Sequence, residues 1–306
     1  MLAVRNLSFS YGQKSVLQDI NLDCKPMLTA IIGPNATGKS TLLKCIAGLL
    51  KHRGSVTLNE VRIENGGAAR QVSYLPQDNG SPIALTVLEA VLLGRHQYLS
   101  WRVGQEDLEL AFGILEDLGI EELATRPLNQ LSGGQQQMVS IAQSLVREPQ
   151  VLLMDEPTSS LDLYRQLEIF NLIKEVTWER NIITLVALHD LNLAARYADR
   201  LVVMNKGTIY NAGEPDEILT KAMIKTVYGV QAEVYMDGDR LPVVVPKVPM
   251  SSARRKRLHD SMEKGDSERV LLDRLTLGSR YIGQSTDNEL LNTEIPSKAQ
   301  QSIILK

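Results

Sequence analysis

Residues 33–41 of this chain read Gly33-Pro34-Asn35-Ala36-Thr37-Gly38-Lys39-Ser40-Thr41. They follow an apolar run at residues 28–32 and lead into a segment of helical periodicity that ends near residue 50. A short buried strand, a glycine-containing loop and a helix start are typical of a phosphate-binding loop, because unpaired N–H groups and the helix dipole favour an anion there. Lys39 would add a positive charge on the outer phosphates, and the Ser40 hydroxyl could bind a magnesium ion that bridges them. The alternative is chance, which produces this pattern in about one percent of chains of this length.

The composition limits the class of protein. At 306 residues the chain can bury a substantial core, in one large or two small domains. The formal net charge of −3 gives no basic field that would favour nucleic acid as the main ligand. The two cysteines, Cys24 and Cys45, lack metal-site or redox-motif spacing and suit a reducing compartment. We find no secretion signal and no apolar run long enough to span a membrane, so we expect any membrane role to come through a partner.

Two further strands are predicted to deliver polar side chains to the edge of the sheet. Asp155 and Glu156 follow the apolar run at residues 151–154, and adjacent carboxylates at the end of a buried strand are unfavourable unless a cation lies near them. Asp155 would bind magnesium, directly or through water, and Glu156 would polarise the water that attacks the outer phosphate. His189 follows the apolar strand at residues 182–188 and would contact the terminal phosphate. The alternative for Asp155 and Glu156 is a solvated acidic turn, and the alternative for His189 is a structural histidine.

A second helix start is predicted at Ser132-Gly133-Gly134-Gln135, before a helix that ends near residue 146. Ser132 is a good cap, and the glycine pair leaves bare backbone that could hold an anion. Taken alone, the string also fits a turn and a cap. Tyr11, beside a turn at Gly12, could stack on a purine ring or simply pack at the edge of the sheet.

The remaining pattern predicts the organisation of the chain. Short alternating runs between residues 2 and 63 indicate an N-terminal antiparallel β piece. Residues 82–147 have mainly helical periodicity and read as an inserted helical subdomain, whose first helix begins with a capping box of Thr86 and Glu89. Pro215 is predicted to open one helix that runs to about residue 228. Residues 247–306 read as a flexible polar extension, with a basic run at 254–257.

Taken in order, these motifs resemble those of the ATP-binding cassette (ABC) ATPases, the motor subunits of ABC transporters. The resemblance covers roughly residues 2–230. Residues 33–41 match the Walker A motif, Gln77 the Q-loop, residues 131–135 the signature motif and residues 151–156 the Walker B motif. Residues 160–162 match the D-loop, His189 the switch histidine and Tyr11 the adenine-stacking aromatic. Seven motifs in family order are far more specific than any one of them.

The resemblance implies an α/β fold: a P-loop NTPase (RecA-like) core with an N-terminal antiparallel β subdomain and an inserted α-helical subdomain, all within residues 1–246. It also implies a homodimer that hydrolyses ATP with Mg²⁺, in which nucleotide on the Walker A motif of one copy is capped by Ser132 and Gly134 of the other. In the family such dimers drive a membrane permease, which docks near the Q-loop and the helical insert. The expected location is therefore the cytoplasmic face of the cell membrane.

The implied site has three sets of residues. The catalytic set is Lys39, Gln77, Glu156 and His189. The magnesium set is Ser40, Gln77 and Asp155. The nucleotide-binding set is Tyr11, Gly33, Pro34, Asn35, Ala36, Thr37, Gly38, Lys39, Ser40, Thr41, Ser132, Gly133, Gly134, Gln135 and Asp162.

Within the family, residues 189–200 and 213–219 resemble importers of the iron–siderophore, haem and cobalamin type, in which a separate substrate-binding protein and the permease select the cargo. Ala36 stands where many members have glycine, and a left-handed conformation there would cost about 1–2 kcal/mol. Gln136, Met138 and Gln143 replace positions that are commonly basic.

Three alternatives remain at this stage. A cassette protein that acts on ribosomes or DNA would usually carry two cassettes, a coiled coil or a zinc insertion, and this chain shows none of these. An exporter ATPase would share the same motifs. A small-molecule kinase or GTPase would leave residues 132–134 and His189 without a purpose.

Overall fold

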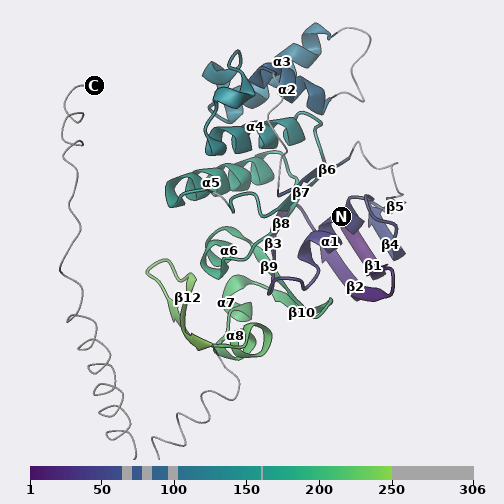
Figure 1. The fold of residues 1–306 in the computed structure, drawn as a ribbon, viewed down its shortest axis with the longest axis vertical. Coiled ribbons are helices and arrows are strands. Elements are labelled where there is room, and N and C mark those ends of the chain that lie inside the picture. Colours follow the sequence, from purple (N-terminus) through teal and green to yellow (C-terminus); the bar gives the residue numbers. More distant parts are fainter. Residues whose placement is uncertain (64–70, 78–84, 96–102, 160, 250–306) are drawn as a thin grey trace, which may run out of the picture. The chain divides into compact units, whose positions relative to one another are not determined.

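The computed structural model describes residues 1–63, 71–77, 85–95, 103–159 and 161–249. Its central layer is a six-stranded sheet of order β10-β9-β3-β8-β7-β6 (Figure 1). Five of the strands are parallel, and β10 pairs antiparallel with β9 at one edge. The strands are β3 (Met27–Ile32), β6 (Val72–Leu75), β7 (Val151–Asp155), β8 (Ile183–Ala187), β9 (Arg200–Asn205) and β10 (Thr208–Gly213). The α/β class predicted from the sequence is confirmed.

Both faces of this sheet are covered, which is why its inner strands are almost entirely apolar. In β7 the side chains of Leu152 and Met154 join one buried cluster, together with helices α5 (Leu163–Glu179) and α6 (Leu191–Tyr197). The alternate residues Val151 and Leu153 join a second cluster with helix α1 (Lys39–Ile46). The period-two alternation of a strand thus divides the core into two layers.

The second core layer also contains the N-terminal antiparallel sheet, of order β2-β1-β4-β5. Its strands are β1 (Leu2–Tyr11), β2 (Lys14–Cys24), β4 (Arg53–Leu58) and β5 (Val61–Arg62). Helix α1 contacts β2 of this sheet as well as β7 and β8 of the central sheet. The antiparallel β piece predicted from the sequence is therefore present, and it places the β1–β2 turn near the loop that opens α1.

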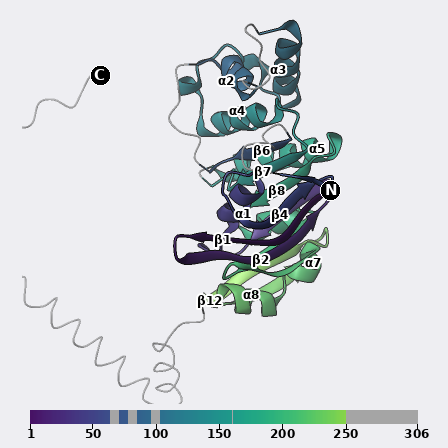
Figure 2. The ribbon, with the colours of Figure 1, turned by 90° about the vertical axis from the view of Figure 1, so that its right-hand side faces the viewer.

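The inserted helices gather beyond β6 in both views (Figure 1 and Figure 2). They are α2 (Val87–Gly94), α3 (Gln105–Asp117) and α4 (Gly133–Leu145), with short 3₁₀ turns η1 (Glu121–Leu123) and η2 (Leu128–Gln130). The predicted capping box is confirmed, since Thr86 accepts from the Glu89 N–H and Glu89 from the Thr86 N–H. Residues 82–84 and 96–102 of the predicted insert lie outside the described residues.

The end of the described chain differs from the prediction. In place of one helix there are two, α7 (Pro215–Ile218) and α8 (Lys221–Tyr228), because the Thr220 hydroxyl accepts from the Met223 N–H and starts a new helix. A hairpin of β11 (Val230–Met236) and β12 (Pro242–Pro249) follows, which the sequence analysis did not predict. Strand β12 thus continues past the predicted boundary at residue 246, and residues 250–306 lie outside the described residues.

The hairpin is fastened to helix α6 by one side chain. The Asn192 amide donates to the Val244 carbonyl at 3.3 Å and accepts from the Val244 N–H at 2.8 Å. Within the ranges that the structure describes, no helix combines the length and the apolar character needed to cross a membrane.

Candidate functional site

The loop at residues 33–38 joins β3 to α1, and its lysine is turned inward. Lys39 is 6% exposed, and its ammonium donates to the carbonyl oxygens of Gly33 at 2.9 Å and Pro34 at 3.4 Å. Burial lowers the pKa of Lys39 below its ordinary value, while the carboxylates of Glu156 and Asp155 offset part of this shift. The cation is therefore held against the loop backbone, with the two carboxylates predicted from the sequence close enough to affect it.

The backbone of the loop has the conformation expected for a phosphate cradle. Ala36 has a φ of 63°, which confirms the left-handed conformation considered from the sequence. The Thr37 hydroxyl donates to the Pro34 carbonyl at 2.8 Å and closes the turn. The N–H groups of the first turn of α1 have no intrahelical partner and are available to an anion.

Asp155 ends β7 and is 4% exposed. The Ser40 hydroxyl donates to its Oδ1 at 2.8 Å, and the Tyr74 hydroxyl donates to its Oδ2 at 3.2 Å. Burial and then the charge of Asp155 raise the pKa of Tyr74 above its ordinary value, so this hydroxyl keeps its proton. Tyr74 was not predicted as a site residue, although it lies on the strand that leads to Gln77.

Glu156 meets two of the three other predicted catalytic side chains. Its Oε2 accepts from the Gln77 amide at 3.2 Å and lies 3.7 Å from His189 Nδ1. Its backbone is held in place as well, because the Glu156 N–H donates to the Ala187 carbonyl of β8 at 3.1 Å. The carboxyl ends of β6, β7 and β8 thus bring together side chains that are far apart in the sequence.

A cavity of about 620 Å³ lies beside this edge. The lining residues that were also predicted as site residues from the sequence are Tyr11, Asn35, Ala36, Gly38, Lys39, Ser40, Thr41, Gln77 and Glu156. Sequence analysis missed five others, which are Lys14, Ser15, Val16, Lys206 and Gly207. Gly33, Pro34, Thr37, Asp155 and His189 are not among the lining residues.

Tyr11 lines the cavity and ends β1, just before the turn to β2. Its side chain is 52% exposed and meets Phe9 edge-on at a centroid distance of 4.7 Å. An exposed ring of this kind can take a flat ligand against its free face.

The turn that carries Lys206 and Gly207 is fixed to β2 by a hydrogen bond from the Gln18 N–H to the Gly207 carbonyl, at 2.8 Å. The place of this turn at the cavity depends on the packing of β10 against β2, which no local pattern indicates.

The second predicted helix start lies apart from this cavity. Ser132 caps α4, with its Oγ accepting from the Gln135 N–H at 3.3 Å while the Gln135 side chain accepts from the Ser132 N–H at 3.0 Å. Asp162 caps α5 by accepting from the Arg165 N–H at 2.9 Å. None of Ser132, Gly133, Gly134, Gln135 and Asp162 lines the cavity, and Ser160 lies outside the described residues.

Comparison with known proteins identifies the family of this chain. Residues 17–159 match the ABC transporter family. An ABC transporter ATP-binding protein of Methanocaldococcus jannaschii is 42% identical over 252 residues, which cover 80% of this chain and 98% of that protein. The iron(3+)-hydroxamate import ATP-binding protein of Bacillus subtilis is 38% identical over 243 residues, which cover 77% of this chain and 90% of that protein.

A solved structure gives the same result for the fold. The dimeric structure of a bacterial ABC transporter cassette superposes with a TM-score of 0.61 at 29% identity, and the match covers 70% of this chain and 99% of the cassette. The sequence motifs, the cavity at the phosphate loop and these relatives agree with one another, and the chain belongs to the ABC transporter family as an ATP-binding subunit.

Proposed function

We propose that this chain is the ATP-hydrolysing subunit of an importer for an iron chelate, haem or cobalamin. Its family consists of ATPases coupled to transport. The observation that carries the proposal is the convergence of Lys39, Asp155, Glu156 and His189 at one edge of the parallel sheet, beside a cavity large enough for a nucleotide. The import of a chelate is supported by relatives such as the Bacillus subtilis protein, which is named for import of iron(3+)-hydroxamate.

The residues at this edge fit Mg·ATP. Ser40, Asp155 and Gln77 offer a hydroxyl, a carboxylate and an amide, which are the oxygen donors that Mg²⁺ takes together with water and phosphate. Magnesium bound there would neutralise charge that develops on the phosphates. Lys39 and the first-turn N–H groups of α1 would hold the phosphates, and Tyr11 would pack on the base.

Glu156 is proposed as the group that orients and polarises the attacking water. Its Oε2 lies within reach of the Gln77 amide and of His189 Nδ1, so its direction is fixed by two neighbours. His189 is 58% exposed at its side chain and would contact the terminal phosphate. Water attack at the γ-phosphorus breaks its bond to the bridging oxygen and releases ADP and phosphate.

The active site is proposed to need two copies of the chain. The capped helix start at Ser132 offers N–H groups and a hydroxyl but does not line the cavity of its own chain. A head-to-tail homodimer would place it over nucleotide bound by the other copy. A dimer of this kind would work beneath a permease at the cytoplasmic face of the membrane, with a separate substrate-binding protein that delivers the cargo.

The test is the substitution Glu156→Gln, which keeps the size of the side chain and removes the base. We expect ATP affinity within about twofold of wild type and turnover lower by about 10²–10⁴. We also expect ATP to drive dimerisation, measured by sedimentation velocity. Glu179→Gln, at an exposed position at the end of α5, is the matched control. Turnover at the wild-type rate in Glu156→Gln would remove Glu156 from this role.

The cargo is tested separately. Transport of ferric hydroxamate, haem and cobalamin is measured in proteoliposomes that contain this chain with the permease that copurifies with it. ATP-dependent uptake of one of the three supports the chelate proposal, and uptake of none of them contradicts it while leaving the ATPase assignment intact.

A further inference from the structure

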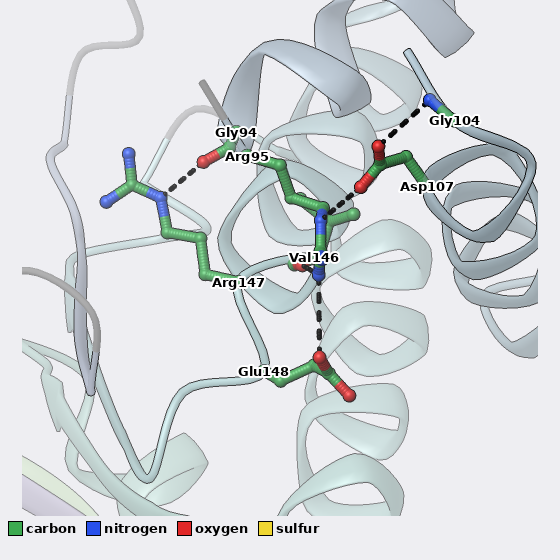
Figure 3. Close-up of polar contacts among 7 residues, drawn as sticks. All are labelled: Gly94, Arg95, Gly104, Asp107, Val146, Arg147 and Glu148. Atoms are coloured by element: carbon green, nitrogen blue, oxygen red, sulfur yellow. Dashed lines mark hydrogen bonds and ion pairs between the residues drawn. The ribbon is translucent and has the colours of Figure 1, made fainter. Parts of the chain in front are cut away.

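A cluster of polar contacts ties together the ends of three inserted helices, away from the nucleotide cavity (Figure 3). Arg95, just past the end of α2, donates from Nε to Asp107 Oδ1 at 3.0 Å and from Nη1 to the Val146 carbonyl at 3.2 Å. Its Nη1 also lies 3.4 Å from Glu148 Oε2. The other oxygen of Asp107 accepts from the Gly104 N–H at 3.1 Å. We call Arg95, Asp107, Val146 and Glu148 the Arg95 clasp.

The central pair of the clasp is largely removed from solvent. The side chains of Arg95 and Asp107 are 17% and 16% exposed, compared with 46% and 51% for the Arg5–Asp23 pair on the N-terminal sheet. A pair with this little exposure is weakly screened by salt, and a guanidinium that donates in two fixed directions sets the geometry of its partners.

A second arginine forms a hydrogen bond between the ends of α2 and α4. Arg147 Nε donates to the Gly94 carbonyl at 2.7 Å (Figure 3), and the Gln143 amide donates to the Ala90 carbonyl at 3.0 Å. A Cβ at Gly94 would lie 2.3 Å from the Gln143 carbonyl oxygen and 2.7 Å from Val146 Cγ1. Only glycine fits there, so α2 meets the end of α4 backbone to backbone.

The clasp lies at the joint between the helix that presents Ser132 and the strand that presents Asp155. Val146 is the C-cap of α4, Glu148 has a φ of 51°, and β7 begins at Val151. Helix α4 is 13 residues long, about 20 Å, so a small change of angle at this joint moves the far end of the helix by several times more than the joint itself. The position of Ser132 relative to the catalytic strand therefore depends on the groups that hold residues 146–148.

We propose that Arg95 is a positioning residue for ATP hydrolysis, because it fixes the joint between α4 and β7 and so directs the Ser132 helix start toward nucleotide held by a second copy of the chain. The proposal rests on the two-copy site described under Proposed function. Arg95 does not touch the cavity, so its removal changes the closure of two copies and leaves nucleotide binding by one copy unaffected.

The test compares two affinities in the Glu156→Gln background. One is the ATP-driven dimerisation constant from sedimentation velocity at graded protein concentrations. The other is the ADP affinity of the single copy from titration calorimetry. We expect Arg95→Gln to weaken dimerisation about tenfold, within the usual range of coupling between sites, with ADP affinity within about twofold. Arg95→Lys keeps the positive charge but loses the guanidinium that donates in two fixed directions. We expect its dimerisation constant to lie between those of the Glu156→Gln parent and the Arg95→Gln variant. Arg5→Gln, which removes the exposed arginine–carboxylate pair, leaves both constants unchanged.

Each other outcome decides against the proposal. Dimerisation of Arg95→Gln equal to that of its parent overturns it. So does a parallel loss of dimerisation and ADP affinity in a variant that unfolds in urea at the same midpoint as its parent, because the effect would then lie in nucleotide binding by the single copy. If Arg95→Gln does not fold, Asp107→Asn takes its place, because it removes the charged acceptor at nearly constant shape. Failure of the Glu156→Gln parent to dimerise overturns the two-copy site itself, and the Arg95 proposal with it.

Discussion

The turn at Gly207 offers a direct test of how closely the cavity wall is packed. Gly207 has a φ of 83°, and a Cβ placed on it would lie 2.4 Å from the Val16 carbonyl oxygen. Alanine in a left-handed conformation costs about 1–2 kcal/mol. Forcing the turn away from β2 costs about 1–3 kcal/mol more. Alanine has less conformational entropy than glycine in the unfolded chain, which offsets about 0.4–1 kcal/mol of this loss. We expect Gly207→Ala to lower the free energy of unfolding by about 1–5 kcal/mol.

Gly119→Ala is the matched control. Gly119 has a φ of 62°, but a Cβ on it would meet nothing within 4 Å, so only the backbone strain and the unfolded-state effect remain. Urea unfolding of both variants, with midpoints and slopes compared, isolates the clash as a difference of about 1–3 kcal/mol. Because Gly207 lines the cavity, its variant should also bind ADP more weakly, whereas Gly119→Ala should not. The reasoning is refuted if Gly207→Ala is no less stable than Gly119→Ala.

Three further predictions follow from groups near the core and the cavity. Burial raises the pKa of the Cys24 and Cys45 thiols from 9.0 to about 12, so above pH 9 the unfolded chain loses protons that the folded chain keeps. The free energy of unfolding should fall by about 1.4 kcal/mol per thiol per pH unit up to about pH 12. Urea unfolding at pH 8 and 10 under reducing conditions should show a smaller fall in the double alanine variant than in wild type. An equal fall in the two proteins contradicts this. Tyr74→Phe removes a hydrogen bond to the Asp155 carboxylate, of a kind that contributes about 1.5–3 kcal/mol. The Mg²⁺ concentration for half-maximal hydrolysis should therefore rise severalfold. An unchanged Mg²⁺ dependence would exclude an effect of the hydroxyl on the metal site. Tyr11→Ala should weaken ATP binding about two- to tenfold while Tyr11→Phe does not, as measured by calorimetry, and equal affinities would show that the ring does not hold the base.

The central fold could be predicted because each of its strands is recognisable from its own short apolar run of sequence. A parallel strand that is buried on both faces of the sheet is almost entirely apolar, and β7 and β8 follow this pattern except at Asp155, which ends β7, and at Thr184. The C-terminal part was misread because a threonine within a helical pattern can either continue the helix or cap a new one. Thr220 caps α8, and only the structure distinguishes the two.

The β11–β12 hairpin was missed although its sequence carried a signal. Asp237 and Gly238 stand between a run of strand-forming residues at 230–236 and a valine-rich run at 242–249, a combination that favours a hairpin. In the structure the Asp237 carboxylate accepts from the N–H groups of Asp239 and Leu241 and closes this turn.

The candidate site divides in the same way. Lys39, Asp155, Glu156 and His189 could be predicted because each follows or precedes a recognisable strand or loop. The hydroxyl of Tyr74 could not, since its bond to Asp155 depends on the register between β6 and β7. Lys206 and Gly207 depend on how one sheet edge meets another, which no single segment encodes.

The attachment of the last hairpin to helix α6 has a practical use. His189 immediately precedes Asp190, which caps α6, and Asn192 on the first turn of that helix grips Val244 through both halves of its amide. The neighbouring Val245 is exposed to solvent and lies outside the cavity. A spectroscopic label introduced at Val245 would therefore report whether the histidine-bearing segment is displaced during turnover, from a position outside the cavity.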